Sequence, residues 1–295
     1  MSYYKTVNDY LKQKYGEKVY KVSINGGFTC PNRDGTLGTG GCIFCSGMGS
    51  GDFAPEASMS VKDQIEAGIK QTKAKNPTKF IAYFQAFTNT YAPVERLEQL
   101  YKEAMDHPKI VGLSIATRPD CLQDEVLSLI ERLNRIKPVW VELGLQTINE
   151  ETARYIRRGY SLNVYDEAVK KLKDIGAEVI THVILGLPGE TKEDMLKTVG
   201  YVAKSGATGI KLQLLHVIRG TDLEKDYNAG LFECMSMEEY VSLIKDCIDI
   251  LPRKMIIHRM TGDGDKRTLV APLWSADKKR VLNALHGALD FNGDK

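Results

Sequence analysis

Short apolar runs alternate with amphipathic stretches along most of this chain. Six runs rich in Val, Ile, Leu and aromatic residues are predicted strands, at residues 19–24, 79–87, 109–117, 138–146, 178–187 and 209–217. Most of them are too continuously apolar for a sheet with one face in water. The pattern therefore predicts buried parallel strands.

Five stretches between these strands carry apolar residues at i, i+3, i+4 and i+7, and they are predicted helices: 60–75, 92–107, 122–136, 163–176 and 191–206. We expect Ser60 and Thr191 to be N-caps, and Gly176 and Gly206 to end their helices. Successive βα units imply right-handed crossovers and a sheet covered by helices. The fold class is therefore α/β, as either an open doubly wound sheet or a partial barrel.

The regular alternation of predicted strands and helices ends after about residue 230. There we predict a helix over 236–251, a strand over 254–260, a Gly/Asp loop over 261–265 and a final helix over 276–290. The chain is thus expected to have an N-terminal helical extension (1–18), a core (19–230) and a C-terminal α/β extension (231–295).

Composition indicates the cellular compartment but does not identify a binding partner. The 295 residues are 43% hydrophobic and carry a formal net charge of +2, so charge neither demands nor excludes a nucleic acid. The polar N-terminus has no signal-peptide pattern, and no segment approaches the ~18 apolar residues of a membrane span. We expect a cytoplasmic protein that does not bind membranes. In that reducing compartment, clustered cysteines indicate a metal or catalysis rather than disulfides.

Three of the six cysteines, Cys30, Cys42 and Cys45, lie in the stretch CPNRDGTLGTGGCIFC directly after the first predicted strand. α/β proteins place their chemistry at this edge of the sheet. Three thiolates on a Gly-rich loop suit a [4Fe–4S] cluster with one open iron. A structural zinc site would need a distant fourth ligand, such as His182, His216 or His258.

The other three cysteines are isolated in sequence. Cys121 follows Pro119 and Asp120 at the C-terminal end of a predicted strand, where a thiol facing the cavity would be a hydrogen donor. Small buried cysteines are common, so the core is the favoured place for it. Cys234 and Cys247 lack the spacing and the glycines of a second cluster site.

The cysteine triad, with Phe44 before its last cysteine, resembles that of the radical S-adenosylmethionine (SAM) family. The usual spacing there is CxxxCxxC, and the C-x11-C-x2-C seen here resembles the branch of the Elongator catalytic subunit and its bacterial relatives. VILGLPGE (183–190), ATRPD (116–120) and HVIRGTDLEK (216–225) also resemble segments of this family. The resemblance covers roughly residues 19 to 220. It implies a partial (β/α)6 TIM-type barrel, a [4Fe–4S] cluster on Cys30, Cys42 and Cys45, and SAM as second cofactor.

The same resemblance suggests residues that bind SAM. QAFTNTY (85–91) stands where the family has GGE, so Gln85 or a neighbouring carbonyl would accept from the methionine amino group. Glu142 and Gln146 would bind hydroxyls, and Arg157 or Arg158 would pair with the methionine carboxylate. Gly186 belongs to the segment that packs on the adenine.

The ending IIHRMTGDGDKRTLVAPLW (256–274) resembles short bacterial relatives of the Elongator subunit that lack its acetyltransferase domain. By this resemblance the substrate is the wobble uridine of tRNA, converted from 5-carboxymethylaminomethyluridine to 5-aminomethyluridine. The implied partners are the tRNA anticodon arm, a one-electron donor such as flavodoxin or ferredoxin, and a downstream tRNA methyltransferase.

Several alternatives stay open from the residues alone. The chain is either such an enzyme, a radical SAM enzyme acting on a small tetrapyrrole-like molecule, or a non-catalytic zinc-binding RNA module. The basic groups around Arg154–Arg158 and Lys278–Arg280 are candidate RNA contacts, although solvated helix faces are the commoner explanation. His258 and Arg259, before the Gly/Asp loop, either reach the mouth of the site or satisfy local hydrogen bonds.

Overall fold

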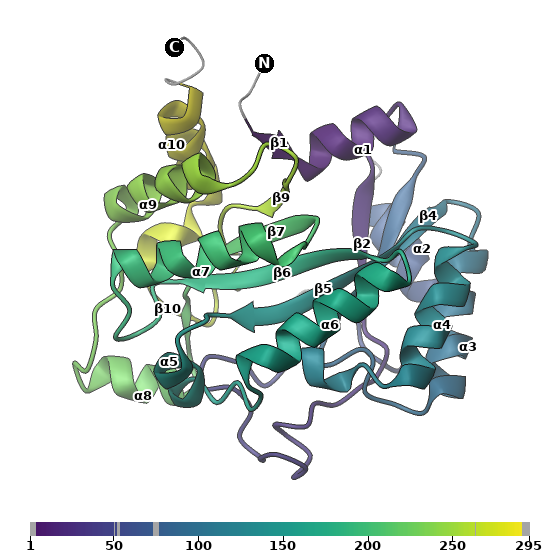
Figure 1. The fold of residues 1–295 in the computed structure, drawn as a ribbon, viewed down its shortest axis with the longest axis horizontal. Helices are drawn as coiled ribbons and strands as arrows, with labels where there is room; N and C mark the ends of the chain where they lie inside the picture. Colours follow the sequence, from purple (N-terminus) through teal and green to yellow (C-terminus); the bar gives the residue numbers. More distant parts are fainter. Residues whose placement is uncertain (1–3, 50, 52–53, 73–76, 263, 291–295) are drawn as a thin grey trace.

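The computed structural model describes residues 4–49, 51, 54–72, 77–262 and 264–290, and its main feature is a curled parallel sheet covered by helices (Figure 1). The strand order is β1-β9-β7-β6-β5-β4-β3-β2, and every pairing is parallel. From β2 to β7 the order follows the sequence without the reversal that a doubly wound sheet requires. The predicted partial barrel is therefore confirmed, with two strands more than the six expected.

The six predicted strands form with small shifts at their ends. They are β2 (Tyr20–Ile24), β3 (Phe80–Phe84), β4 (Ile110–Thr117), β5 (Val139–Gln146), β6 (Glu178–Leu185) and β7 (Gly209–Leu214). All five residues of β3 are buried, as expected of a parallel strand covered on both faces.

The five predicted helices also form: α2 (Val61–Gln71), α3 (Val94–Asp106), α4 (Asp124–Asn134), α6 (Leu162–Asp174) and α7 (Lys192–Ser205). Ser60 and Thr191 accept hydrogen bonds from backbone N–H groups of the first turn, which confirms both N-caps. Gly176 and Gly206 adopt positive φ angles of 72° and 94°, where glycine ends a helix at least cost. Residues 73–75 of the predicted helix 60–75 lie outside the described residues.

The terminal segments contribute to the same sheet. The C-terminal part forms α9 (Met237–Ile250), β9 (Ile256–Arg259) and α10 (Lys278–Asp290), and β9 lies between β7 and β1 (Lys5–Thr6). β1 was not predicted, because two residues carry no periodic signal. The sheet thus crosses the expected boundaries near residues 18 and 230, and the division into three segments stays a prediction.

Four further short elements were not predicted. They are α5 (Glu150–Tyr155), α8 (Asp222–Asn228), and an antiparallel pair of β8 (Val217–Ile218) with β10 (Leu269–Ala271). Asp263, in the predicted Gly/Asp loop, lies outside the described residues.

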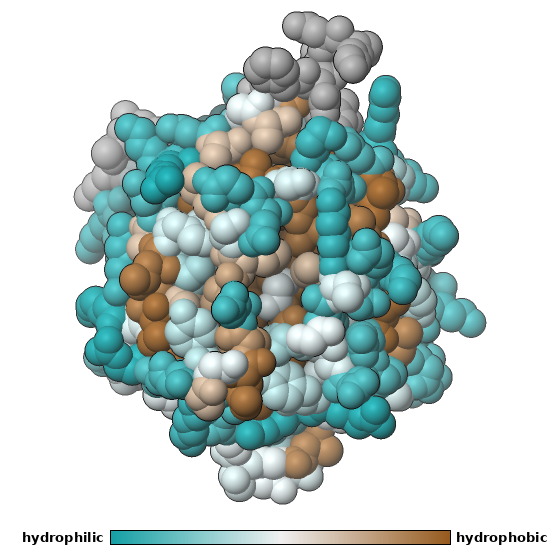
Figure 2. Space-filling model, turned by 90° about the vertical axis from the view of Figure 1, so that its left-hand side faces the viewer, coloured by the Kyte–Doolittle hydropathy of each residue, from teal (hydrophilic) through white to brown (hydrophobic). Residues whose placement is uncertain are grey.

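Helix α1 (Val7–Tyr15) covers the N-terminal end of the barrel. Its Leu11 packs with Ile81, Trp140 and Ile180, which lie early in their strands. This end is therefore filled by side chains, and the opposite end is left for chemistry. On the side that carries α8 and α9, apolar side chains lie in separate patches between hydrophilic ones (Figure 2). Across the part of the chain that the structure describes, we find no helix with both the length and the apolarity to cross a membrane.

Candidate active site

A cavity of about 950 Å³ opens at the C-terminal ends of the barrel strands. Its walls come from the cysteine loop, from the strand ends of β3 to β7, and from the segment after β9. Cys30, Cys42 and Cys45 all line it, together with Gln85, Glu142, Gln146 and Arg158. Seven of the eight predicted site residues thus meet around one cavity, and Gly186 does not line it.

The cysteine loop is fixed to the barrel by a few specific contacts. Ile43, between Cys42 and Cys45, is buried in an apolar cluster with Ile156 and Leu223. The guanidinium of Arg33 donates to the carbonyl of Ser46 (2.6 Å) and lies over the ring of Phe87. These contacts hold a Gly-rich segment that has no helix or strand of its own.

Cys42 is half-buried, and several neighbouring groups act on its thiol. Burial, and then the neighbouring Cys45, raise the pKa of its thiol to about 12. The side chain of Asn32 donates to Cys42 Sγ (3.4 Å) and to the carbonyl of Arg157 (2.6 Å). A thiolate here needs a cation to compensate its burial, as iron would, and the N–H···S contact suits a metal-bound sulfur.

No disulfide joins the cysteines, and the described residues contain no group of three or more Cys, His, Asp or Glu side chains gathered closely enough to hold a metal ion. The triad shares one cavity without forming a closed ligand set, so its role as the cluster site stays a prediction. Of the three histidines proposed for a zinc site, His182 and His216 line the same cavity, but within the described residues none of the three forms a metal-binding group with the cysteines. His182 uses both ring nitrogens within the protein, and His258 packs edge-on against Trp140 away from the cavity lining.

Gln146 combines two signs of a binding residue. Its φ of +68° is a strained conformation for a side chain with a Cβ, and it lies at a register irregularity at the end of β5. Its Oε1 is buried without a hydrogen-bond partner while the residue lines the cavity. Such an acceptor suits a hydroxyl donated by a bound ligand. Phe87 and Arg157 are the other non-glycine residues with positive φ in the described ranges, and both lie beside the cysteine loop.

Gln85 lines the cavity at the end of β3, and its Oε1 accepts from Ser23 Oγ (3.0 Å). Gly186, in contrast, does not line the cavity. It has a φ of +88°, its N–H donates to Met195 Sδ, and an added Cβ would lie 2.8 Å from Met235. This glycine permits a tight turn after β6, whereas Ile184 provides the cavity surface.

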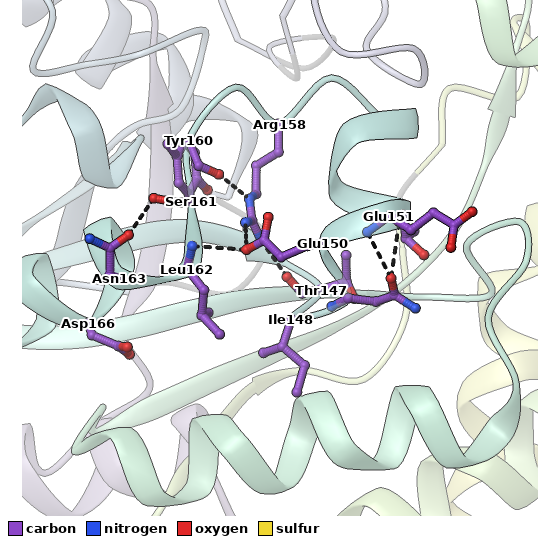
Figure 3. A network of polar contacts seen from close by, with 12 residues as sticks. Thr147, Ile148, Glu150, Glu151, Arg158, Tyr160, Ser161, Leu162, Asn163 and Asp166 are labelled. Carbon is purple, nitrogen blue, oxygen red and sulfur yellow. Dashed lines mark hydrogen bonds and ion pairs between the residues drawn. The ribbon is translucent and has the colours of Figure 1, made fainter.

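The two predicted arginines have protein partners. Arg158 is buried, and its guanidinium donates to the carbonyls of Tyr160 (2.9 Å) and Thr147 (2.6 Å) and to Glu150 Oε1 (2.9 Å), as Figure 3 shows. Its contacts are those of a residue that joins α5 to the end of β5. Arg157 is exposed and pairs with Asp222 (2.6 Å). Neither arrangement supports the predicted pairing with a methionine carboxylate, which stays a prediction.

Glu142 is also satisfied by the protein. Its Oε1 accepts from Lys21 Nζ (2.5 Å) and Ser114 Oγ (2.6 Å), and its Oε2 accepts from His182 Nε2 (2.7 Å) and Lys211 Nζ. Four donors fill the lone-pair positions of a carboxylate. The geometry therefore gives Glu142 the task of holding charged neighbours and provides no support for its predicted contact with a cofactor hydroxyl.

Sequence reasoning also missed Arg118, another arginine that lines the cavity. Arg118, in the ATRPD segment, forms a bidentate pair with Asp120 (2.9 and 2.8 Å) and lies over the ring of Tyr160. The spacing Arg-x-Asp after a strand was the available signal. Cys121, next in sequence, is buried and does not line the cavity, in agreement with the core assignment. Cys247 is also buried in the core, and Cys234 packs beside the apolar cluster around Ile43.

Comparison with known proteins gives consistent matches. The family model described as Radical SAM superfamily matches residues 29–202, and the Radical_SAM C-terminal domain matches residues 207–290. The uncharacterized protein YtqA of Bacillus subtilis (strain 168) is 45% identical over 291 residues, which are 98% of this chain and 90% of YtqA. The tRNA uridine(34) acetyltransferase of Methanocaldococcus jannaschii is 29% identical over 168 residues, which are 56% of this chain and 30% of that protein.

Among solved structures, the archaeal Methanocaldococcus infernus Elp3 with an N-terminal deletion matches with a TM-score of 0.67 and 21% identity. The match covers 85% of this chain and 58% of that one. At this identity, the likeness is one of fold.

Proposed function

Since this chain belongs to the radical SAM superfamily, we propose that it is a tRNA-modifying member that converts 5-carboxymethylaminomethyluridine at the wobble position to 5-aminomethyluridine. The cofactors of the superfamily are a [4Fe–4S] cluster and SAM. When bound, they supply a 5′-deoxyadenosyl radical that removes a hydrogen atom from the substrate. The task of the protein is to place the substrate, hold the cofactors and exclude water.

The cluster ligands in this proposal are Cys30, Cys42 and Cys45. The buried, unpartnered acceptor of Gln146 fits a SAM hydroxyl, and Gln85 stands at the strand end where the SAM amino group would bind. Asn32 would donate to the sulfur of Cys42 and so favour its thiolate.

One observation supports an anionic substrate above the others. The described lining of the cavity contains eight basic residues and two acidic ones: Arg33, Arg118, Arg158, Lys211, Arg259, Lys266, Arg267 and Lys278 against Glu142 and Asp265. The whole chain has a net charge of only +2, so positive charge is concentrated here. Such a field attracts a phosphate backbone. Lys266, Arg267 and Lys278 come from the C-terminal segment.

The relatives favour the same substrate class. Proteins named tRNA uridine(34) acetyltransferase and Elongator complex protein 3 share 29% and 30% identity with more than half of this chain. The match covers only about a third of each of those two proteins. The acetyl transfer in the first name is therefore not part of the proposal.

The chemistry follows from the bonds of the substrate. The methylene between the amine and the carboxylate has C–H bonds weakened by both neighbours, so its hydrogen is the preferred one to remove. Loss of one further electron to a one-electron acceptor gives an iminium ion. Water adds to it, and cleavage of the C–N bond yields the primary amine and glyoxylate. A donor such as flavodoxin or ferredoxin would supply the electron for SAM cleavage, and aminomethyluridine would pass to a methyltransferase.

The test uses tRNA that carries deuterium at that methylene. Reconstituted enzyme, SAM and a reductant should give deuterated 5′-deoxyadenosine, aminomethyluridine in the tRNA and free glyoxylate. Cys45→Ala protein, made in the same way, should give none of the three. If aminomethyluridine forms while the 5′-deoxyadenosine carries no deuterium, the abstraction site is wrong. An unchanged tRNA would exclude this substrate and leave the small-molecule alternative.

A further inference from the structure

A charged cluster, made of Lys21, Ser114, Glu142, His182 and Lys211, lies at the floor of the cavity. Its members come from five strands of the barrel, β7, β6, β5 and β4, which are consecutive in the sheet, and β2, which is separated from β4 by β3. Glu142 is at the centre and accepts from the other four. Because these residues lie in the middle of their strands, the cluster is deeper in the barrel than the cysteine loop.

The cluster has more positive than negative charge. Two lysines contact Glu142, and Arg259 on β9 is close enough to act electrostatically on both of them. Among the described residues, Glu142 is the one carboxylate in contact with either lysine. Burying cations without equal negative charge is costly, and the cost falls when an anion binds. Burial lowers the pKa of Lys211 to about 7, and Lys21 and Arg259 add to this shift while Glu142 opposes it.

Lys211 is the member best placed to meet a ligand. Its side chain is buried and also lines the cavity. Arg259 and Tyr83 line the cavity too, whereas Lys21 does not. An ammonium group has three N–H donors. Two of them are used, toward Glu142 and toward Tyr83 Oη (3.2 Å), and the third has no protein acceptor within the described part of the chain.

We propose that Lys211, supported by Arg259, binds the carboxylate at the end of the substrate's side chain, so that the enzyme selects uridines whose 5-substituent ends in a carboxylate. This inference rests on the proposed function. A carboxylate anchored on the floor would fix the adjacent methylene within the cavity, below the cysteines at its mouth. It would also supply the missing negative charge, and the bare aminomethyl product, which lacks that charge, would leave more readily.

The experiment compares two tRNAs, one with carboxymethylaminomethyluridine and one with the corresponding primary amide. For the wild-type enzyme we expect a KM for the carboxylate about 10- to 100-fold lower than for the amide, because hydrogen bonds to charged groups are the stronger ones. Lys211→Gln should raise the KM for the carboxylate by a similar factor and leave the KM for the amide and for SAM within about threefold. Arg259→Gln should act in the same direction by a smaller factor.

Two controls separate binding from damage to the fold. Lys102→Gln, at an exposed lysine paired with Glu98, should change neither KM. Iron content and the far-UV circular dichroism spectrum of both test variants should match those of the wild type, which shows that they fold. If Lys211→Gln raises the KM for the carboxylate tRNA and for the amide tRNA by the same factor, or raises only the KM for SAM, the carboxylate site on Lys211 is refuted.

A pH series gives a second readout. The groups around Lys211 are Tyr83 on β3, Glu142 on β5, His182 on β6, and the cations Lys21 and Arg259. Burial lowers the pKa of His182 to about 4 and raises that of Tyr83, so neither changes charge between pH 6 and pH 9. Affinity for the free carboxymethylaminomethyl nucleoside should fall by up to about tenfold per pH unit above pH 7, as Lys211 loses its proton. Affinity for aminomethyluridine should not follow this profile.

These outcomes also distinguish the two proposals. If neither tRNA is converted but the wild-type protein still binds the carboxylate nucleoside more tightly than the amide, and Lys211→Gln loses this preference, the proposed reaction fails and the anion site stands. If both tRNAs are converted equally well, the proposed class of reaction is supported and the carboxylate site on Lys211 is refuted.

Discussion

Replacement of Glu142 by Gln tests how the barrel interior is held together. The carboxylate is completely buried and accepts from Lys21, Lys211, His182 and Ser114. Although burial alone would raise the pKa of Glu142, the two lysines hold it well below its usual value, so the group is ionised at neutral pH. The amide has no charge, and its NH2 group faces donors where an acceptor oxygen was.

The expected cost follows from this geometry. Removing one partner of a buried ion pair typically costs about 3–5 kcal/mol, because the other charge stays buried and unpaired. A change of 1 kcal/mol lowers the Tm of a large domain by about 2–4 °C. We therefore expect Glu142→Gln to lower the Tm by about 6–20 °C at pH 7.

The loss should also depend on pH. Burial lowers the pKa of Lys21 and Lys211, while Glu142 opposes that shift, so in the variant both pKa values fall further. Lysines of the unfolded chain titrate near ~10.4 and keep their protons where the folded variant has lost them. Stability of the variant therefore rises between pH 7 and pH 10, by about 1.4 kcal/mol per pH unit for each lysine that is neutral in the folded variant. The gap to the wild type narrows only through a lysine that is still protonated in the folded wild type.

Thermal unfolding followed by circular dichroism, on anaerobically prepared protein at pH 7 and pH 9, measures both effects. The matched control is Glu131→Gln, which removes an exposed i,i+4 pair with Arg135 and should change the Tm by less than about 2 °C. A Glu142→Gln variant as stable as this control at pH 7 would refute the account of the cluster. A gap to wild type that does not narrow at pH 9 would refute the role given to the lysines.

The other predictions concern the cysteines, Gln146 and a helix cap. Single Ala substitutions of Cys30, Cys42 and Cys45 should abolish iron binding and SAM cleavage, whereas Cys234→Ala and Cys247→Ala should retain both; iron analysis and 5′-deoxyadenosine assays decide. Gln146→Gly should raise the KM for SAM about 3- to 10-fold and leave the Tm within about 2 °C, because relief of the positive φ offsets the entropy of glycine. An unchanged KM would remove Gln146 from the SAM site. Thr191→Ala should lower the Tm by about 2–4 °C through loss of the capping box of α7, and Thr191→Ser should restore it.

The sequence predicted the barrel because its signals are local. Six apolar runs and five amphipathic stretches each contain enough residues to show a period, and caps such as Thr191 mark where helices begin. β1 and β8 have two residues each and show no period. The position of β9 beside β7 could not be predicted either, because strand pairing across a long connection depends on packing.

The site was predictable where a spacing carries chemistry, as in the cysteine triad, and less so where partners come from distant strands. Glu142 was expected to bind a cofactor, and only the fold shows that Lys21 and Lys211, 121 and 69 residues away in sequence, occupy its oxygens. Arg158 was likewise expected to bind a cofactor. Thr147 and Glu150 are near it in sequence, but only the folded structure shows that their oxygens accept from its guanidinium. Unpaired buried atoms, such as Gln146 Oε1, are properties of the folded chain alone.

The placement of these features suggests why the protein maintains an ionic cluster in its core. A well-packed apolar layer of similar volume would often be at least as stable as buried ion pairs. The N-terminal end of this barrel has such a layer, with Leu11, Trp140 and Ile180. The charged layer lies two residues further along β5 and β6, at Glu142 and His182, where it forms the floor of the cavity. A cluster that gives up stability at the floor of the cavity is better explained by binding than by folding, and Lys211 is the residue on which this explanation depends.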